Sequence, residues 1–422
     1  MTLIKTSLLN GIAVVIKMLT LLGLNKILAI YVGPAGYAIL GQFLNAVQMI
    51  TNFASGAINQ GVTKYTAEYS KDSARQHTVW RTAAAIALTG SLLIAVFIAA
   101  FNQKLAGWFL KDESLGSVFI WFSTTLVLFV FNSLLQAILN GKREIRRYVI
   151  ANIAGSLFAF AVTTWMAMQM GLYGALVALV IYQSLTFFVT LALIYNANWF
   201  RPSYLFGRID RQVAKNLGKF TIMALTSAVT VPISHILIRN HLGETLGWDA
   251  AGYWEAAWRL SNFYLMLVTT TLSVYYLPKL SELQHSADIK REIIQGYKII
   301  LPVAAACSLA IYLNRDFLIR ALFSTEFAPM EVLFAWQMVG DTLKIGSWIL
   351  AYLMLGKAMI KLFVVSEILS SAMFYVLTVI FTQTMGLEGV ALSHAVNYLI
   401  YWSAMAIFIP KVLRQRARPN TD

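Results

Sequence analysis

Long apolar segments dominate this chain and restrict the folds that are open to it. A helix needs about 20 predominantly apolar residues to cross the hydrocarbon core of a bilayer, and many stretches here reach that length. Only 12% of the 422 residues are charged, whereas a soluble globular chain has about 25%. The sequence therefore predicts an all-α polytopic membrane protein.

Twelve spans can be placed along the chain. The first lacks the small-residue cleavage site of a signal peptide, so we expect it to be retained as a helix. The predicted spans lie near residues 5–31, 36–62, 80–102, 115–140, 148–170, 173–196, 217–240, 250–277, 294–314, 330–355, 358–384 and 388–410.

Lys and Arg residues divide unequally between the two sets of loops that these spans create. Most of the 33 fall in one set, which includes both termini. Cytoplasmic loops carry such an excess, so we expect both termini in the cytoplasm. The same bias explains the net charge of +14, and no nucleic-acid-binding motif accompanies it.

The sequence also repeats itself at a nearly constant offset. The motif at residues 170–174 recurs at 385–389, and Gly-Lys at 141–142 recurs at 356–357. Weaker pairs link 63–64 with 278–279 and 36–37 with 252–253. Two units of six spans enter the membrane in the same direction, which is a parallel repeat. We expect a bundle at residues 1–196, a connector on the cytoplasmic membrane surface at 197–216 and a second bundle at 217–422.

One apolar span, residues 334–355, carries Asp341 and Lys344 near its middle. They are three positions apart, so they share one helix face and can pair. A charge at bilayer depth costs roughly 3 kcal/mol or more, so these side chains should face a bundle interior or a wet cavity. Two interpretations remain open: an ion pair that fixes helix packing, and a polar cavity through which something charged passes.

Other ionisable residues also fall within predicted spans. Lys17 and Lys26 lie in the first span, and Arg259 lies one turn from Glu255, with which it can pair. The acids Glu255 and Glu367, like Asp341, can balance nearby cations, bind Na⁺ or carry protons. Long lysine side chains near span ends also reach the interface, which is the alternative for Lys26.

Several further side chains have a structural and a functional interpretation. Arg239 is expected to be an interfacial anchor. His235 and His394 are either packing residues or proton relays. Trp254 and Trp258, one turn apart, form either part of an aromatic belt or a surface on which sugars stack.

Motifs for enzymatic chemistry are absent from the sequence. None of the Gly-Lys pairs is followed by Ser or Thr, so the chain has no P-loop for ATP. His and Cys residues lack metal-site spacing, and Cys307 is the only cysteine. We therefore expect no catalytic residue, no metal and no cofactor.

Three segments resemble bacterial lipid-linked oligosaccharide flippases: GVTKYTAEYSKD at 61–72, SVYYLPKLSEL at 273–283 and FAWQMVGDTLKIGSW at 334–348. The Gly-Pro-Ala-Gly turn at 33–36 and LPVAAA at 301–306 also fit. Over nearly its whole length the chain is similar to the Wzx-type flippases of O-antigen and enterobacterial common antigen synthesis. These belong to the polysaccharide branch of the MATE-like MOP exporter superfamily.

That resemblance implies two six-helix bundles forming a V around a central cavity in the bacterial inner membrane. It implies a flippase that moves undecaprenyl-pyrophosphate-linked oligosaccharide repeat units to the periplasmic leaflet by alternating access. Membrane lipid, a coupling ion (H⁺ or Na⁺), a polysaccharide polymerase and chain-length proteins are the other expected partners. The predicted substrate-binding cations are Lys17, Lys26, Arg259 and Lys344; the predicted residues for ion coupling or charge balance are Asp341, Glu255 and Glu367; and those for sugar contact are Trp254 and Trp258.

Lys17 and Lys26 lie in a first helix that resembles the first helix of the family. Asp341 and Lys344 lie in the family-like FAWQ-GD-LK motif. Arg259 and the two tryptophans match no family motif, so their roles rest on physical reasoning alone. The alternative function is an ion-coupled exporter of drugs or small metabolites with the same fold. A membrane enzyme is disfavoured because the loops are short, and a purely structural scaffold because charges lie inside the spans.

Overall fold

The computed structural model describes residues 3–283, 285–357 and 359–416, and every regular element in these ranges is helical. Eight of the described helices are long and apolar enough to cross a membrane, as expected for a multi-pass membrane protein. The chain divides into two compact units, Met1–Pro232 (unit 1) and Ile233–Asp422 (unit 2), and each is described by itself.

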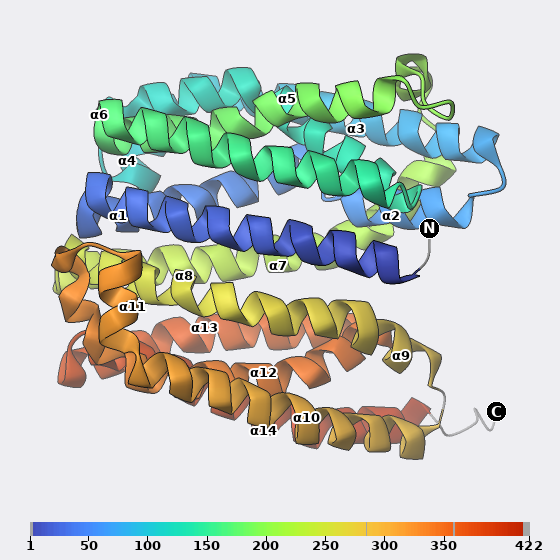
Figure 1. The fold of residues 1–422 in the computed structure, drawn as a ribbon. Helices are drawn as coiled ribbons and strands as arrows, with labels where there is room; N and C mark the ends of the chain where they lie inside the picture. Colours follow the sequence, from blue (N-terminus) through green and yellow to red (C-terminus); the bar gives the residue numbers. More distant parts are fainter. Residues whose placement is uncertain (1–2, 284, 358, 417–422) are drawn as a thin grey trace. The chain divides into compact units, whose positions relative to one another are not determined.

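Unit 1 is built around two very long helical elements, α1 and α6, which pack against each other and against α5. Its elements are α1 (Leu3–Ser55), α2 (Asn59–Glu68), α3 (Ser73–Ala100), α4 (Asn102–Leu110), the 3₁₀ turn η1 (Glu113–Leu115), α5 (Gly116–Gly141), α6 (Ile145–Tyr195), the 3₁₀ turn η2 (Pro202–Leu205) and the first part of α7 (Arg211–Thr245) (Figure 1).

Unit 2 begins within α7 and is centred on α12, which packs against α14 and α10. The elements that follow α7 are α8 (Trp248–Thr271), the π-helical segment η3 (Leu272–Tyr276), α9 (Leu277–Glu282), α10 (Ser286–Leu313), α11 (Arg315–Leu322), the 3₁₀ segment η4 (Thr325–Leu333), α12 (Phe334–Gly356), α13 (Ile360–Met385) and α14 (Glu388–Arg416).

Glycines with positive φ interrupt both long elements of unit 1. Gly33 (φ 67°, ψ 178°) divides α1, and Pro34, whose fixed φ suits the first turn of a helix, starts the next segment. Gly171 (φ 55°, ψ −133°) divides α6 in the same way. Only glycine adopts such angles without strain. The two halves of α1 run in opposite directions after this turn (Figure 1).

The backbone repeats with the spacing that the sequence motifs predict. Gly171 has its counterpart 215 positions later in Gly386, with φ 58° and ψ −136°. The helix ends repeat too: α5 ends at Gly141 and α12 at Gly356, and the following helices begin at Ile145 and Ile360. Each unit therefore uses the same order of helices, as expected of an internal duplication.

The eight apolar helices differ from the twelve predicted spans for two physical reasons. Each of α1 and α6 contains two predicted spans joined at a glycine turn, yet counts as one element. The spans predicted at 217–240 and 250–277 lie in α7 and α8, which are not among the eight apolar helices. In the described parts of these two helices, the buried charged side chains of Arg239 and Glu255 lower the hydropathy.

The predicted connector, residues 197–216, packs onto unit 1. The ring of Tyr204 stacks on that of His77 with centroids 3.7 Å apart, and Trp199 Nε1 donates a hydrogen bond to Glu144 Oε1 at 2.8 Å. Phe200 is buried, whereas Phe206 is exposed. Aromatic residues of the connector therefore anchor it to the helices of unit 1.

Candidate functional site

Two arginines share one carboxylate inside unit 2. Arg239 Nε, on α7, lies 2.9 Å from Glu255 Oε2, and Arg259 Nε lies 2.7 Å from Glu255 Oε1. The predicted Glu255–Arg259 pair is therefore present. The expectation that Arg239 is an interfacial anchor is wrong, because its side chain is only 2% exposed. A buried arginine needs an ion-pair partner. The partner of Arg239 is Glu255, which lies on the next helix, 16 positions further along the chain.

A second buried carboxylate, Asp341 on α12, is held by hydrogen bonds from three side chains. His394 Nε2 lies 2.9 Å and Gln337 Nε2 3.3 Å from Asp341 Oδ1, while the hydroxyl of Tyr264 donates to Oδ2 at 2.7 Å. Gln337 Nε2 also donates to the hydroxyl of Ser261 at 3.1 Å. The carboxylate and His394 are both fully buried. These bonds compensate the loss of hydration of Asp341.

Lys344 has aromatic neighbours in place of a carboxylate. Its Nζ lies 4.2 Å from the ring centroid of Trp258, 5.0 Å from that of Trp348 and 5.6 Å from that of Tyr398. All three distances are within the range of cation–π attraction. We call these three rings the Lys344 cage. Asp341 on the same helix and Glu367 on α13 are both within electrostatic range of Lys344.

Asp341 and Lys344 interact electrostatically, but no direct ion pair joins them in the part of the chain that the structure describes. The two residues do share one face of α12, as their spacing requires. However, the 2.9 Å contact that Asp341 Oδ1 makes is with the imidazole Nε2 of His394, from α14. The acceptor positions of the carboxylate are occupied from neighbouring helices, and the long lysine side chain turns to the rings instead.

Gly340 allows His394 to approach α12 closely enough for this pair. A Cβ atom at position 340 would lie 2.3 Å from His394 Cδ2 and 3.0 Å from the backbone nitrogen of Ala395. Both distances are too short for ordinary contact, so α12 and α14 could not pack this closely with a larger residue there.

Aromatic contacts join the two charged networks. The ring of His235, on α7, packs edge to face on Trp258 with centroids 4.5 Å apart, and on Trp254 with centroids 5.4 Å apart. Trp258 also packs against His394 at 5.2 Å. Trp254 is fully buried, so in this structure it offers no surface on which a sugar could stack. Trp258 is only partly buried.

Unit 1 holds the other two predicted cations in a different setting. Lys17 lines a cavity of about 160 Å³ between α1, α5 and α6. Most of the other polar lining residues are neutral amides and hydroxyls, and none of the described lining residues is acidic: Thr20, Gln136, Asn152, Ser156, Tyr182, Gln183 and Thr186. Lys26, also on α1, is partly buried and does not line this cavity.

Positions that are equivalent in the internal repeat carry chemically different side chains in the two units. The residues of unit 1 that lie 215 positions before the three charged or titratable residues of the Asp341 region are apolar: Leu126, Phe129 and Leu179 correspond to Asp341, Lys344 and His394. The same backbone pattern thus carries a buried polar network in unit 2 and apolar side chains in unit 1, of which Leu126 is fully buried.

Most of the partners that complete the site were not predicted. Tyr264, Gln337, Trp348 and Tyr398 carried no signal of their own, since aromatic and amide residues are common in apolar helices. His394 was noted as a packing residue or a proton relay, and its position inside an apolar span was the signal that it needed a partner. Among the described residues no group of three or more His, Cys, Asp or Glu side chains could hold a metal ion.

Comparison with solved structures identifies the fold. The chain matches a multidrug resistance MATE family transporter of the MOP superfamily in an inward-facing conformation, with a TM-score of 0.75, 16% identity, and 95% of this chain and 96% of that chain covered. A MOP superfamily transporter from Pyrococcus furiosus gives a TM-score of 0.68 at 17% identity, covering 97% and 96%. The helices and their buried charges thus define a polytopic membrane protein with the MATE fold.

Sequence comparison is more specific. The family model for polysaccharide biosynthesis proteins matches residues 27–332. The lipid III flippases of Escherichia coli K12 and Shigella flexneri are each 32% identical over 405 residues, covering 96% of this chain and 97% of theirs. The chain belongs to this polysaccharide biosynthesis protein family, which confirms the resemblance seen in the sequence motifs. These relatives group it with transporters and not with catalysts.

Proposed function

We propose that this protein is a flippase for undecaprenyl-pyrophosphate-linked oligosaccharide repeat units, which it moves from the cytoplasmic to the periplasmic leaflet of the inner membrane. Transport proceeds by alternating access and serves the synthesis of O-antigen or a related surface polysaccharide. Support comes from the lipid III flippases, which match almost the entire chain at 32% identity. Their name indicates a lipid substrate, whereas that of the multidrug resistance transporter with the same fold indicates drugs.

The proposed topology has twelve spans in two six-helix bundles, residues 1–196 and 217–422, joined by the connector at 197–216. The glycine turns in α1 and α6 support this count, since each divides a long element into two spans. The excess of Lys and Arg in the loops next to both termini supports cytoplasmic ends.

One observation carries the proposal at the level of the site: Lys17 borders a polar cavity with no acid among its described lining residues. A cation in such a place favours an anionic group, and the pyrophosphate of the lipid carrier supplies one. The surrounding amides and hydroxyls are suited to hydrogen bonds with phosphate oxygens and sugar hydroxyls. Lys26 and Arg259 assist as further cations of the substrate path.

Lys344 is the corresponding substrate-binding cation of unit 2. Cation–π attraction contributes about 0.5–2 kcal/mol per contact, whereas a phosphate group offers an opposite charge and several charge-assisted hydrogen bonds at once. The ammonium can therefore leave the cage for an arriving anion and return when that anion departs. Trp258, a wall of the cage, is placed to contact the sugars, whereas Trp254 supports it from behind.

Coupling to H⁺ or Na⁺ is assigned to Asp341. Its carboxylate meets a titratable imidazole, a phenol and an amide, so a proton can be exchanged there without exposing a bare charge. Glu255 balances two arginines and Glu367 balances Lys344. A polysaccharide polymerase and chain-length proteins are the proposed partners in the membrane.

The experiment that tests this function measures transport in proteoliposomes loaded with a pyrophosphate-linked lipid oligosaccharide. An impermeant lectin reports which leaflet holds the sugar. We expect transport by the wild type, and at least a tenfold lower rate in Lys17→Gln. The matched control is Lys64→Gln, which removes an exposed lysine paired with Glu68 and should leave the rate unchanged. Absence of transport by folded wild-type protein, with and without ion gradients, would overturn the proposal.

A further inference from the structure

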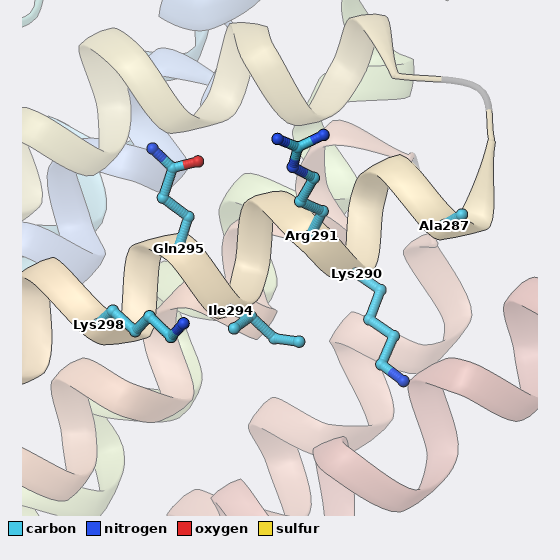
Figure 2. A pocket seen from close by; sticks show the side chains of 6 residues that line it. All are labelled: Ala287, Lys290, Arg291, Ile294, Gln295 and Lys298. Carbon is cyan, nitrogen blue, oxygen red and sulfur yellow. The ribbon is translucent and has the colours of Figure 1, made fainter.

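The cavity beside Lys17 is lined from three helices of unit 1, so side chains can contact a ligand there from several directions. Its lining residues come from α1, α5 and both halves of α6. The larger cavity along α10, of about 490 Å³, is different. Its cations Lys290, Arg291 and Lys298 are exposed and point to different sides of a single helix (Figure 2). Individual side chains can therefore select a ligand more strictly beside Lys17 than along α10.

Four of the described residues that line the Lys17 cavity carry a hydroxyl group, and three of these groups already use their proton. Thr20, Ser156 and Thr186 each donate to the backbone carbonyl four positions earlier in the same helix, at 2.7, 3.0 and 2.8 Å respectively. A hydroxyl has one proton, so these three groups can only accept further hydrogen bonds. They are suited to the hydroxyls of a sugar and not to the oxygens of a phosphate.

Tyr182 carries the fourth hydroxyl, which accepts a hydrogen bond instead of donating one. Gln183 Nε2 donates to the Tyr182 oxygen at 3.1 Å. No hydrogen bond that Tyr182 donates is found within the part of the chain that the structure describes. Because Tyr182 lines the cavity, its phenol proton is available to an acceptor inside it.

A chain of side-chain hydrogen bonds keeps Gln183 in this orientation. Its Oε1 accepts a hydrogen bond from Asn132 Nδ2, on α5, at 3.1 Å. The Asn132 oxygen in turn accepts one at 2.8 Å from the hydroxyl of Thr190, which also lies 3.0 Å from the carbonyl of Thr186. We call Gln183, Asn132 and Thr190 the amide relay. An amide whose oxygen is occupied presents its N–H groups to the next residue, so the relay directs the proton of Tyr182 away from Gln183.

The internal repeat indicates that packing alone does not require the amide relay. Asn132 and Thr190 are fully buried and do not line the cavity, so joining α5 to α6 is the simplest role for them. However, the equivalent helices α12 and α14 also pack against each other. The residues there, 215 positions after those of the relay, are Ser347, Tyr398 and Met405. Ser347 donates to a carbonyl of its own helix at 2.7 Å. The relay in unit 1 therefore favours a role beyond packing.

We propose that Tyr182 is a specificity-determining residue of the flippase, whose hydroxyl donates a hydrogen bond to the pyrophosphate group that Lys17 attracts. This inference rests on the proposed function, which assigns the cavity to that group. A lysine supplies charge without fixed geometry, whereas a phenol held by Gln183 supplies a donor at a defined place. Tyr182 thus distinguishes a phosphate, which is rich in acceptors, from a cationic amine, which offers only donors. Asn132 is a positioning residue that acts through Tyr182.

The test measures binding of farnesyl pyrophosphate, a short polyprenyl pyrophosphate, to the purified full-length protein. Tyr182→Phe removes only the hydroxyl and should weaken binding roughly tenfold, as expected for one hydrogen bond to a charged group. Farnesol has the same tail without the charge and should bind the variant and the wild type alike. The matched control is Tyr173→Phe on the same helix. The hydroxyl of Tyr173 accepts a hydrogen bond from Ser117 outside the cavity, so this control should bind farnesyl pyrophosphate like the wild type.

A double variant tests whether Asn132 acts through Tyr182. Asn132→Leu should weaken binding of farnesyl pyrophosphate, because Gln183 is then free to turn and accept the phenol proton. Adding Asn132→Leu to Tyr182→Phe should cause no further loss, since the hydroxyl that the relay orients is already absent. Thermal unfolding of each variant shows that it is folded. Additive losses of binding would overturn the assignment of Asn132 as a positioning residue.

Failure of this inference can be distinguished from failure of the proposed function. Wild-type binding of farnesyl pyrophosphate by Tyr182→Phe would overturn the inference, while transport by the wild type in proteoliposomes would still support the function. Equal affinity of the wild type for farnesyl pyrophosphate and farnesol would also overturn the inference, because no group would then recognise the charged head. Absence of transport by the wild type, together with binding that depends on Tyr182, would overturn the function and leave the role of Tyr182 as a donor in place.

Discussion

Substitution of Gly340 by alanine tests whether the close approach of α14 to α12 holds the Asp341 network together. The added methyl group would lie 2.3 Å from His394 Cδ2 and 3.0 Å from the backbone nitrogen of Ala395. Backbone cannot yield as a flexible side chain does, so the histidine ring must turn or the helices must separate. Either response breaks the 2.9 Å contact between His394 Nε2 and Asp341 Oδ1.

The expected cost follows from two terms. Overpacking a tight core costs about 1–3 kcal/mol, and a lost hydrogen bond to a charged group about 1.5–3 kcal/mol. Gly340→Ala should therefore destabilise unit 2 by roughly 3–5 kcal/mol. For a unit of this size, that lowers the thermal midpoint of the detergent-solubilised protein by about 6–20 °C.

The control is Gly218→Ala, because no atom of the described side chains or backbone lies within 4 Å of a methyl group at that helical position. Alanine there should raise stability slightly, since glycine costs about 0.5–1 kcal/mol in a helix. The double variant Gly340→Ala with His394→Ala should unfold well above the temperature expected from adding the two single effects, because the smaller side chain removes the clash. Additive effects, or a wild-type midpoint for Gly340→Ala, would refute this account of the packing.

Four further substitutions test other parts of the structure. Glu255→Gln leaves Arg239 buried without its counter-ion and should cost about 3–5 kcal/mol in thermal unfolding. Arg259→Gln should cost less, because the carboxylate keeps its partner on α7; equal losses would contradict the shared-carboxylate arrangement. Lys344→Met should retain the thermal midpoint yet lose lipid transport in proteoliposomes at least tenfold, whereas normal transport by this variant would remove the lysine from the mechanism. Gly171→Ala forces a side chain into φ 55° and should lower the yield of folded protein and its midpoint by an amount equivalent to about 1–3 kcal/mol, an expectation that an unchanged midpoint would contradict.

Local spacing in the sequence predicted the features that depend on one helix or on the duplication. The Glu255–Arg259 pair follows from an i,i+4 interval, and the equivalent turns at Gly171 and Gly386 follow from repeated motifs at a constant offset. The same reasoning placed Asp341 and Lys344 on one face of α12. In each case the geometry of a single helix, or of its repeat, fixes the result.

Contacts between helices could not be predicted from the sequence. The partner of Asp341 lies 53 positions further on, and no local interval links it to α12. Arg239 was placed at the interface because its span ends nearby, but Glu255 on the following helix holds it inside the bundle. Likewise, the rings around Lys344 come from three helices, and only their packing turns separate aromatic residues into a cage.

The apolar side chains at the matching positions of unit 1 indicate that the fold itself does not require the polar network that unit 2 has there. Leu126, Phe129 and Leu179 occupy the places of Asp341, Lys344 and His394, and the same turns and helix ends are present around them. The scaffold is therefore built equally well with hydrocarbon there. Since ionised groups are the costlier choice in such a setting, their presence in unit 2 favours a role beyond packing.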